Sequence, residues 1–426
     1  LLLWRVFLFL HMLLKKKELV SKILIFLFLI AYFLPNFNAI DRIGYQWFYL
    51  SIISLISITY LLFENELVLR IRSLFNEKGI LFYSLFIIWA LISITYSINS
   101  ASALVTINQY FTVFTTLIFL RLLLLNINNG VEFILKLFLT LLIFEVVLCL
   151  YPILIDLENG NLTFRAMRYS GAASNINITA FSLLYKSPIL LYFLTKENKP
   201  ALKFVLSFLL FIILFIVSIL GTRGAFLGVI PLFVSYLFYL FFIKEHVAFK
   251  IQHLLIVFSV LTITVLSNLY LSEKNSNVLS RASSISVNTQ DGSVNQRIRY
   301  YKQGLNHFIN NPLIGVGVGN WKLKSIDYDK NNIRGFIIPY HAHNDLVQLL
   351  AELGILGALT YLLFIYFSVK KLFISRIFKN KIHFLLLGSI SIYFIDSMLN
   401  FPIARPISQL YLVCFICLIS LHKDKV

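Results

Sequence analysis

The sequence is poor in charged residues and in cysteine. Only 13% of its 426 residues are Asp, Glu, Lys or Arg, whereas about 25% is usual in a soluble domain. Its 3 cysteines, Cys149, Cys414 and Cys417, all lie in apolar runs. Cys414-x-x-Cys417 has no βαβ context and no partner cluster, so we expect helix packing there and no disulfide framework, redox pair or zinc site.

What the sequence has in excess is apolar residues, which make up 59% of the chain. A soluble or disordered protein of this length would leave much of that surface in water. A membrane-spanning helix needs about 20 mostly apolar residues. Candidate runs cover residues 19–35, 45–63, 80–97, 103–125, 131–155, 179–195, 204–220, 225–243, 254–271, 345–369, 384–400 and 406–421. The sequence therefore predicts an all-α polytopic membrane protein with about 12 transmembrane helices.

The basic residues are distributed unevenly among the predicted connections. The net charge is +18, which we attribute to the positive-inside rule and to anionic lipid headgroups, with no nucleic-acid partner. Lysine-rich connections alternate with connections poor in lysine, so both termini are expected in the cytoplasm. The predicted organisation is an N-terminal bundle of spans 1–9 (1–271), a periplasmic segment (272–343) and three C-terminal spans (344–426).

The short outward-facing connections contain arginine and no lysine. A topology rule gives no reason for this choice, whereas the planar guanidinium fork binds phosphate oxygens bidentately. The alternative is that each arginine snorkels or pairs locally at the membrane interface. The five residues are Arg42, Arg165, Arg168, Arg223 and Arg405.

Several ionisable residues fall within the predicted spans. Glu145 and Lys186 lie at middle depth on consecutive antiparallel spans, and we expect them to pair in a structural role. Asp396 lies near the outer end of its span and is expected to face a cavity.

The periplasmic segment contains a helical pattern and a glycine-rich turn. Apolar residues recur at Ile298, Tyr301, Leu305 and Phe308, with Arg297, Arg299 and Lys302 on the other faces. This spacing predicts an amphipathic helix on the outer leaflet. Gly315, Gly317 and Gly319 follow without the βαβ unit of a dinucleotide site, so we expect a tight fold-back beside the membrane.

The stretch that follows holds the strongest candidate for catalysis. A helix beginning near Asn344 would place Asp345, Gln348 and Glu352 on one polar stripe, which should face a wet cavity. His343 stands at the helix entry, where a neutral imidazole could accept a proton from a bound hydroxyl group. The alternative is an interfacial histidine that caps the helix. A metal site at His341-x-His343 lacks a convincing third ligand.

These residues carry a family resemblance. His343-Asn344, then nine residues, then Gly354-x-x-Gly357 resembles the signature of O-antigen ligases and the related O-antigen polymerases. The accompanying pieces, in the expected order, are Arg168-Tyr-Ser-Gly171 with Asn175-x-Asn177, Thr222-Arg223-Gly224, Arg297, and Asn311-Pro-Leu-x-Gly315-x-Gly317. Thr222 stands where the family often has serine.

The resemblance implies a GT-C-like, metal-independent, inverting glycosyltransferase without a cofactor. It would move a glycan from undecaprenyl diphosphate to lipid A–core, or to another glycan acceptor, at the outer face of the bacterial inner membrane. It also implies that Arg168, Arg223 and Arg297 hold the diphosphate and that His343 activates the acceptor. Supporting roles are expected for Asn344, Asp345, Glu352 and Arg299.

Other functions remain open at this point. A polymerase of the same superfamily would use a second lipid-linked repeat unit as acceptor, and a protein O-oligosaccharyltransferase would carry features that are not evident here. A flippase or transporter of lipid-linked sugars would explain many spans, but it should show paired repeats or corresponding helix breaks. The chain shows no such symmetry, and a transporter gives no reason for the histidine motif.

Overall fold

The computed structural model describes residues 16–35, 41–242, 246–271, 292–333, 338–374 and 381–421. These residues form α-helices and short 3-10 helices and no strands, which confirms the all-α prediction. Nine of the described helical stretches are long and apolar enough to cross a membrane. They contain α5 (Lys78–Ile92), α6 (Ser100–Leu125), α7 (Gly130–Glu158), α8 (Ile176–Lys196), α9 (Pro200–Leu220), α10 (Arg223–Phe242), α11 (Val247–Leu271), α15 (Asp345–Val369) and α17 (Lys381–Leu399).

The other three predicted spans are helical too, but shorter or less apolar. Residues 19–35 correspond to α2 (Lys17–Leu29) continued by the 3-10 helix η1 (Ile30–Phe33). Residues 45–63 correspond to α3 (Arg42–Leu61), and residues 406–421 match α18 (Pro406–Leu421), a short apolar helix. A multi-pass membrane protein is therefore confirmed, whereas the count of twelve stays a prediction.

The chain folds into two compact units, each assembled from separate parts of the sequence. Leu1–Ile134, Tyr300–Lys371 and Phe401–Val426 form the first unit, and Leu135–Arg299 with Leu372–Asn400 form the second. The predicted segments 1–271, 272–343 and 344–426 follow membrane crossings instead and stay a prediction. Residues 272–291 and 334–337 of the middle segment lie outside the described residues.

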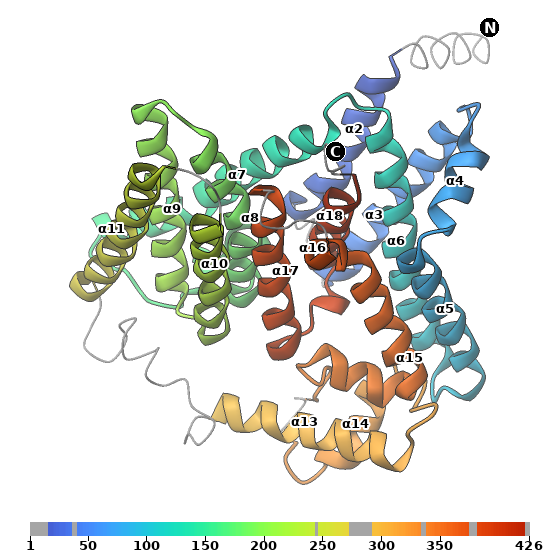
Figure 1. Cartoon of the computed structure of the whole chain (residues 1–426). Coiled ribbons are helices and arrows are strands. Elements are labelled where there is room, and N and C mark those ends of the chain that lie inside the picture. Colours follow the sequence, from blue (N-terminus) through green and yellow to red (C-terminus); the bar gives the residue numbers. More distant parts are fainter. Residues whose placement is uncertain are drawn as a thin grey trace, which may run out of the picture. The chain divides into compact units, whose positions relative to one another are not determined.

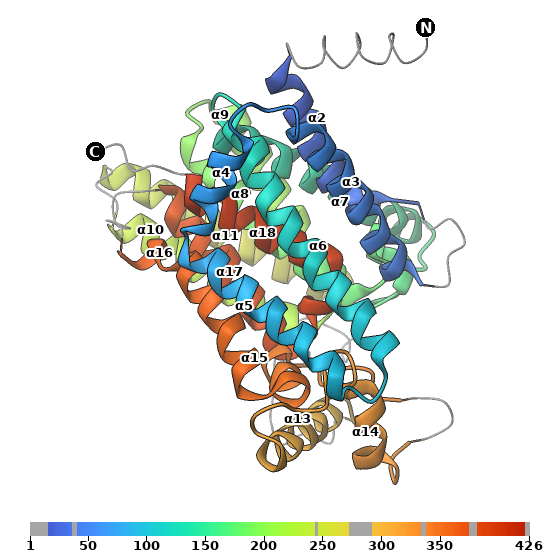
Figure 2. The ribbon, with the colours of Figure 1, turned by 90° about the vertical axis from the view of Figure 1, so that its right-hand side faces the viewer.

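In the first unit, α15 packs lengthwise against α5, as Figures 1 and 2 show. Aromatic rings interlock along this contact: the ring centroids of Tyr83 and Phe364 are 4.5 Å apart, and those of Phe86 and Tyr361 are 5.2 Å apart. In the same unit, α6 packs against α3 and α18. The part of α15 that follows its break at Gly354 is therefore held against α5 by aromatic packing.

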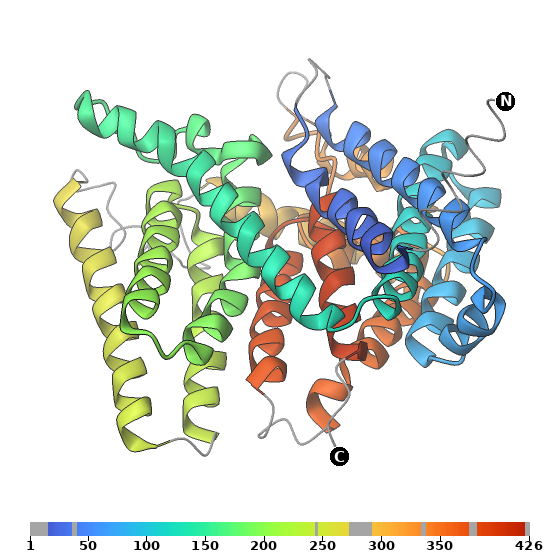
Figure 3. The same ribbon diagram turned by 90° about the horizontal axis from the view of Figure 1, so that it is seen from above.

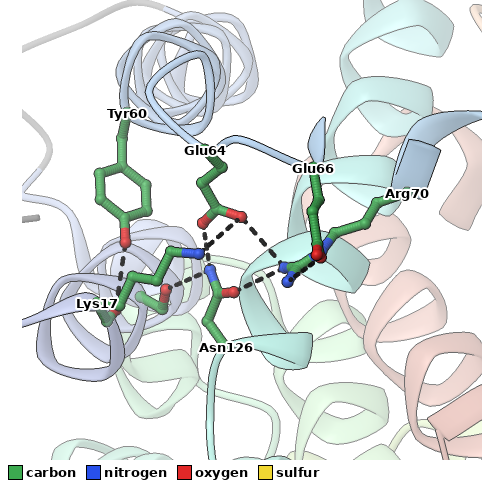
Figure 4. Close-up of polar contacts among 7 residues, drawn as sticks. Lys17, Tyr60, Glu64, Glu66, Arg70 and Asn126 are labelled. Atoms are coloured by element: carbon green, nitrogen blue, oxygen red, sulfur yellow. Dashed lines mark hydrogen bonds and ion pairs between the residues drawn. The ribbon is translucent and has the colours of Figure 1, made fainter. Parts of the chain in front are cut away.

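A buried carboxylate joins the helix ends of the first unit, as Figure 4 shows. Glu64 is 6% exposed and accepts a hydrogen bond of 2.5 Å from the Asn126 amide. It also pairs with Lys17 at 3.5 Å and with Arg70, on α4 (Leu67–Phe75), at 3.1 Å. The charge is thus fully compensated, as burial of a carboxylate requires.

In the second unit, α8 is the most buried of the nine apolar helices and packs against α9, α10 and α17. Figure 3, viewed from above, shows α9 in green beside α11 in olive. The predicted pair is confirmed: Lys186 Nζ lies 2.5 Å from Glu145 Oε2, and both side chains are fully buried. Ser182 Oγ donates to the same carboxylate at 3.2 Å.

The expectation for Asp396 was wrong. This residue is fully buried and accepts hydrogen bonds from the Tyr185 hydroxyl and from Asn400 Nδ2. Both partners come from the second unit, so Asp396 connects α17 to α8 and does not line a cavity.

Candidate functional site

His343 lies directly before α15 in an unusual backbone conformation. Its φ is +56°, in the left-handed region that few non-glycine residues adopt. Asn344 caps the helix, since its side-chain oxygen accepts a hydrogen bond of 3.1 Å from the Val347 N–H. The chain therefore turns at His343, and α15 begins two residues later, at Asp345.

Aromatic residues from two segments fix the imidazole of His343. The ring of Tyr300, on α13 (Gly292–Asn310), stacks at a centroid distance of 6.1 Å, and Phe401 meets the imidazole nearly edge-on at 5.2 Å. The Tyr301 hydroxyl donates a hydrogen bond of 2.9 Å to the His343 carbonyl oxygen. Strained conformations of this kind persist only where the surroundings enforce them, and they cluster at functional sites.

The glycine-rich turn that precedes α14 (Trp321–Asp329) packs against a kink in α15. Gly354 has φ +64° and ψ −164°, so the helix breaks there and releases carbonyl groups. Val316 N–H donates to Ala351 at 3.0 Å and Gly317 N–H donates to the Glu352 carbonyl at 2.9 Å. Trp89 Nε1 donates to the Leu353 carbonyl at 2.9 Å. The predicted tight fold-back is confirmed, and the first glycine of the Gly354-x-x-Gly357 motif adopts the backbone angles that form the kink.

Glu352 belongs to this packing and does not face a wet cavity, so that expectation was wrong. Its side chain is 1% exposed. Its carboxylate accepts hydrogen bonds from Gly319 N–H at 2.8 Å and from Trp321 N–H at 3.3 Å. The spacing of the polar stripe was predicted correctly, but the carboxylate holds the glycine-rich turn in place.

The stripe continues from Glu352 to the first histidine of the motif. Gln348 Nε2 donates to Glu352 Oε1 at 3.3 Å, and Gln348 Oε1 lies 3.3 Å from His341 Nδ1. Burial lowers the pKa of His341 from 6.5 to about 4, with a smaller contribution from the charge of Arg405. The imidazole of His341 is therefore neutral at physiological pH and acts as a hydrogen-bonding link.

The turn between α17 and α18 packs against the same residues. Asp345 Oδ2 accepts a hydrogen bond of 3.1 Å from Ile403 N–H, in the 3-10 helix η5 (Pro402–Ala404). The ring of Phe401 stacks on His341 with a centroid distance of 4.1 Å. Arg405 lies over Phe401, with its Cζ atom 4.2 Å from the ring centroid. Phe401 thus links both histidines of the motif to an arginine.

The predicted amphipathic helix is confirmed as α13, and Figures 1 and 2 show it with α14 beside the beginning of α15. Among its described side chains the buried positions are Tyr300, Gln303, Gly304 and His307, which share one face of the helix. Leu305 is 39% and Ile309 is 70% exposed. The polar face thus packs on the protein while apolar side chains point outward, and contact with the outer leaflet stays a prediction.

Arg168 lies in the second unit, on the 3-10 helix η3 (Met167–Ala173). Its side chain is 53% exposed and pairs with Asp156 Oδ2 at 2.6 Å. Asp156 also accepts a hydrogen bond of 2.5 Å from the Tyr169 hydroxyl, whose pKa is raised by burial and by this carboxylate. Sequence reasoning missed Asp156, although its place at the end of a span, one loop before Arg168, was visible.

The other arginines expected at the diphosphate, Arg223 and Arg297, and the supporting Arg299 also lie in the second unit. Arg223 is half-buried and is the first residue of α10, two residues after Gly221, the left-handed C-cap of α9. Arg297 and Arg299 are half-buried on the first half of α13. The structure thus brings His343, Asn344, Asp345 and Glu352 together in the first unit and places Arg168, Arg223, Arg297 and Arg299 in the second.

Comparison with known proteins identifies one family. Residues 208–362 match the family model described as O-Antigen ligase, which confirms the resemblance to this superfamily inferred from the motifs. The family consists of glycosyltransferase-like ligases and polymerases, and it implies lipid-linked glycans and membrane lipids as partners. The matched segment contains Arg223, Arg297 and His343 but not Arg168. No curated protein gives a significant sequence match.

Proposed function

We propose, on the premise that residues 208–362 form an O-antigen ligase domain, that this protein transfers a glycan from undecaprenyl diphosphate to a hydroxyl group of lipid A–core. The reaction takes place at the outer face of the bacterial inner membrane, and both termini are cytoplasmic. The proposal rests on the family match, on the alternation of basic connections and on the arginine-only outer connections.

The observation that carries the proposal is the conformation of His343. The residue has φ +56° and is enclosed by the rings of Tyr300 and Phe401. An interfacial cap would not need this geometry, because Asn344 already caps α15. A general base, in contrast, requires a fixed imidazole within reach of the proton that it accepts.

The proposed chemistry is a single displacement at the anomeric carbon of the donor. The acceptor hydroxyl oxygen forms the new glycosidic bond while His343 takes its proton. The bond between the anomeric carbon and the diphosphate oxygen breaks, and its electron pair leaves with the diphosphate. Attack from the face opposite the leaving group inverts the anomeric configuration. No metal or cofactor is required in this scheme.

The leaving group needs charge stabilisation more than it needs a proton. Arg168, Arg223 and Arg297 are proposed to supply it, since guanidinium groups bind phosphate oxygens bidentately. The pair of Arg168 with Asp156 is compatible with this role. Arg168 is 53% exposed, and exposed pairs contribute only about 0–1 kcal/mol, so a diphosphate can compete for the guanidinium.

The second candidate function is an O-antigen or exopolysaccharide polymerase, which the same family match supports. It differs only in its acceptor, a second lipid-linked repeat unit. A lipid-linked sugar flippase is a more distant alternative, and it gives no role to the fixed imidazole of His343.

Deletion of the gene, followed by separation of the surface polysaccharide, tests the proposal. Loss of the ligase should leave long chains on the lipid carrier and none on lipid A–core. Loss of a polymerase should leave single repeat units on lipid A–core. An unchanged polysaccharide pattern in the deletion strain would contradict both functions.

A further inference from the structure

Arg405 is a buried cation that forms no salt bridge with a residue that the structure describes. The residue is 4% exposed and stands between η5 and α18. Its Nε and Nη1 atoms are buried and have no hydrogen-bond partner among the residues that the structure describes. The Asp345 carboxylate accepts a hydrogen bond from the N–H of Ile403, two residues before Arg405 in the chain.

Other arginines of the first unit show how the same fold treats a cation that has only a structural role. Arg121 is 7% exposed, and its two Nη atoms donate to Glu77 at 3.0 and 2.6 Å. Arg70 pairs with Glu64 and Glu66 (Figure 4). Burial of a charge is strongly unfavourable unless a counter-charge or hydrogen bonds compensate it. Arg405 lacks that compensation, which points to an anionic ligand.

The surroundings of Arg405 hold the guanidinium in a fixed orientation. His341 stacks on Phe401 with an interplanar angle of 15° and a centroid distance of 4.1 Å. Since that face of the ring is occupied, Arg405, with Cζ 4.2 Å from the centroid, must use the opposite face. The neutral imidazole of His341 does not repel the cation. A stacked guanidinium keeps its in-plane N–H groups available for an anion.

The first turn of α18 adds to this preference. The helix has 16 residues and begins directly after Arg405, at Pro406. The first N–H groups of a helix have no carbonyl partner within the helix, and the helix dipole favours negative charge there. An anion bound by Arg405 would therefore also lie near a positive helix end.

The position of this site relates it to the acceptor. Phe401 touches Arg405 on one face and the candidate base, His343, on its edge at 5.2 Å. All three residues belong to the first unit, whereas the arginines assigned to the donor diphosphate belong to the second. We propose that Arg405 binds a phosphate group of the acceptor and positions the acceptor hydroxyl beside His343. This inference rests on the proposed function.

Phosphate on the acceptor has two sources, and they distinguish the two candidate reactions. A ligase acceptor carries phosphate on lipid A–core, and a polymerase acceptor carries the diphosphate of a second undecaprenyl chain. In both cases the bidentate fork would contact phosphate oxygens. Arg405 is thus assigned to acceptor recognition, as a positioning residue that takes no part in proton transfer.

Equilibrium binding to the purified protein in detergent, without turnover, tests the assignment. The probes are lipid A–core, dephosphorylated lipid A–core, undecaprenyl diphosphate and undecaprenol, and the variants are Arg405→Met and, as control, Arg72→Met. Arg72 is an exposed arginine of α4 in the same unit. Arg405→Met should lower the affinity for one phosphate-bearing probe by roughly tenfold or more, as expected for a lost charge-assisted hydrogen bond. Arg72→Met should bind all four probes normally.

The two sources give different results. Weaker binding of lipid A–core, with no effect of dephosphorylation in the variant, indicates a ligase acceptor. Loss of one of two binding sites for undecaprenyl diphosphate indicates a polymerase acceptor. Unchanged binding of both phosphate-bearing probes overturns the proposal. Because binding needs no turnover, failure of the proposed reaction would not by itself produce that result.

The melting temperature of the ligand-free protein distinguishes phosphate binding by Arg405 from a purely structural role. Ligand-free Arg405→Met should melt no lower than wild type, because removal of a buried uncompensated charge is neutral or stabilising. A lower melting temperature together with weaker undecaprenol binding would overturn the proposal. If Arg405→Met cannot be purified, Arg405→Lys keeps the charge without the fork, and it should still bind the phosphate-bearing probe several-fold more weakly.

Discussion

A β-carbon on Gly354 would collide with the carbonyl oxygen of Leu313. The two residues are brought together because α15 breaks at Gly354 and the glycine-rich turn enters the break. Pro312 completes the arrangement, since its carbonyl oxygen accepts a hydrogen bond of 2.8 Å from the Ile355 N–H. The kink therefore depends on glycine both for its backbone angles and for the missing side chain.

Gly354→Ala is expected to lower the melting temperature of the purified protein strongly. Strain at such backbone angles costs about 1–3 kcal/mol, and the collision with Leu313 adds to it. Gly160→Ala is the matched control, because Gly160 also has a positive φ (+65°) but has nothing within 4 Å of the added carbon. If both variants melt alike, the close approach to Leu313 contributes no stability.

The buried pair of Glu145 and Lys186 predicts strongly non-additive mutations. Glu145→Leu or Lys186→Met alone leaves one charge buried without its partner, and each should destabilise the second unit by roughly 3–5 kcal/mol. The double variant Glu145→Leu with Lys186→Met should be near wild type, because it removes both charges. Melting temperatures in detergent measure all three. Additive losses would show that the two side chains do not interact.

Much of the fold could be predicted because membrane-spanning helices are long apolar runs. The predicted span 345–369 coincides with α15, and 406–421 coincides with α18. The pairing of Glu145 with Lys186 was also predictable, since two opposite charges at equal depth on consecutive spans have few other partners.

The partners of the polar stripe could not be predicted. Helical periodicity places Gln348 and Glu352 on one face, but it does not state what lies opposite that face. The opposing element is the turn at Gly319, about 30 residues away in the chain and folded against α15 through backbone hydrogen bonds. Contacts of this kind leave no periodic signal, so a structural carboxylate looked like a cavity residue.

The pKa of His341 predicts a dependence of stability on pH. Because the folded-state pKa of about 4 lies below the ordinary value of 6.5, the unfolded chain binds this proton more tightly. The contribution to stability is therefore complete above pH 6.5 and is lost as the pH falls towards 4. Melting temperatures at pH 8 and pH 5 for wild type and His341→Gln measure it, and the advantage of wild type should shrink at pH 5. An advantage that grows on acidification would mean that the imidazole becomes charged in the folded state.

Arg223→Lys is expected to lose most transfer activity although the charge is kept. Lysine lacks the planar fork that binds two phosphate oxygens at once. The transfer rate with lipid-linked donor measures the loss, at matched amounts of membrane-inserted protein. The control is Arg72→Lys, on the exposed surface of α4, which should leave the rate unchanged. Wild-type activity in Arg223→Lys would show that this residue supplies only positive charge and that its bidentate fork is not needed.

Variants of His343 separate catalysis from architecture. As a general base the imidazole must be neutral, so transfer should decline as the pH is lowered and the proton acceptor is lost. A base contributes typically 10²–10⁴-fold, so His343→Ala should be inserted in the membrane and bind donor but transfer almost nothing. A residual rate near about a tenth of wild type would be too high for this role.

His343→Gln and His343→Asn remove the proton acceptor while they keep a polar side chain. Asparagine is the better match to the backbone, because it tolerates the left-handed conformation that His343 adopts (φ +56°). If His343 only shapes the entry to α15, His343→Asn should be the most active variant, and His343→Ala should lower the amount of folded protein. If His343 is the base, all three variants are inactive at normal abundance. Transfer by His343→Asn within a few-fold of wild type would therefore remove His343 from the chemistry and leave the arginines as its only supported participants.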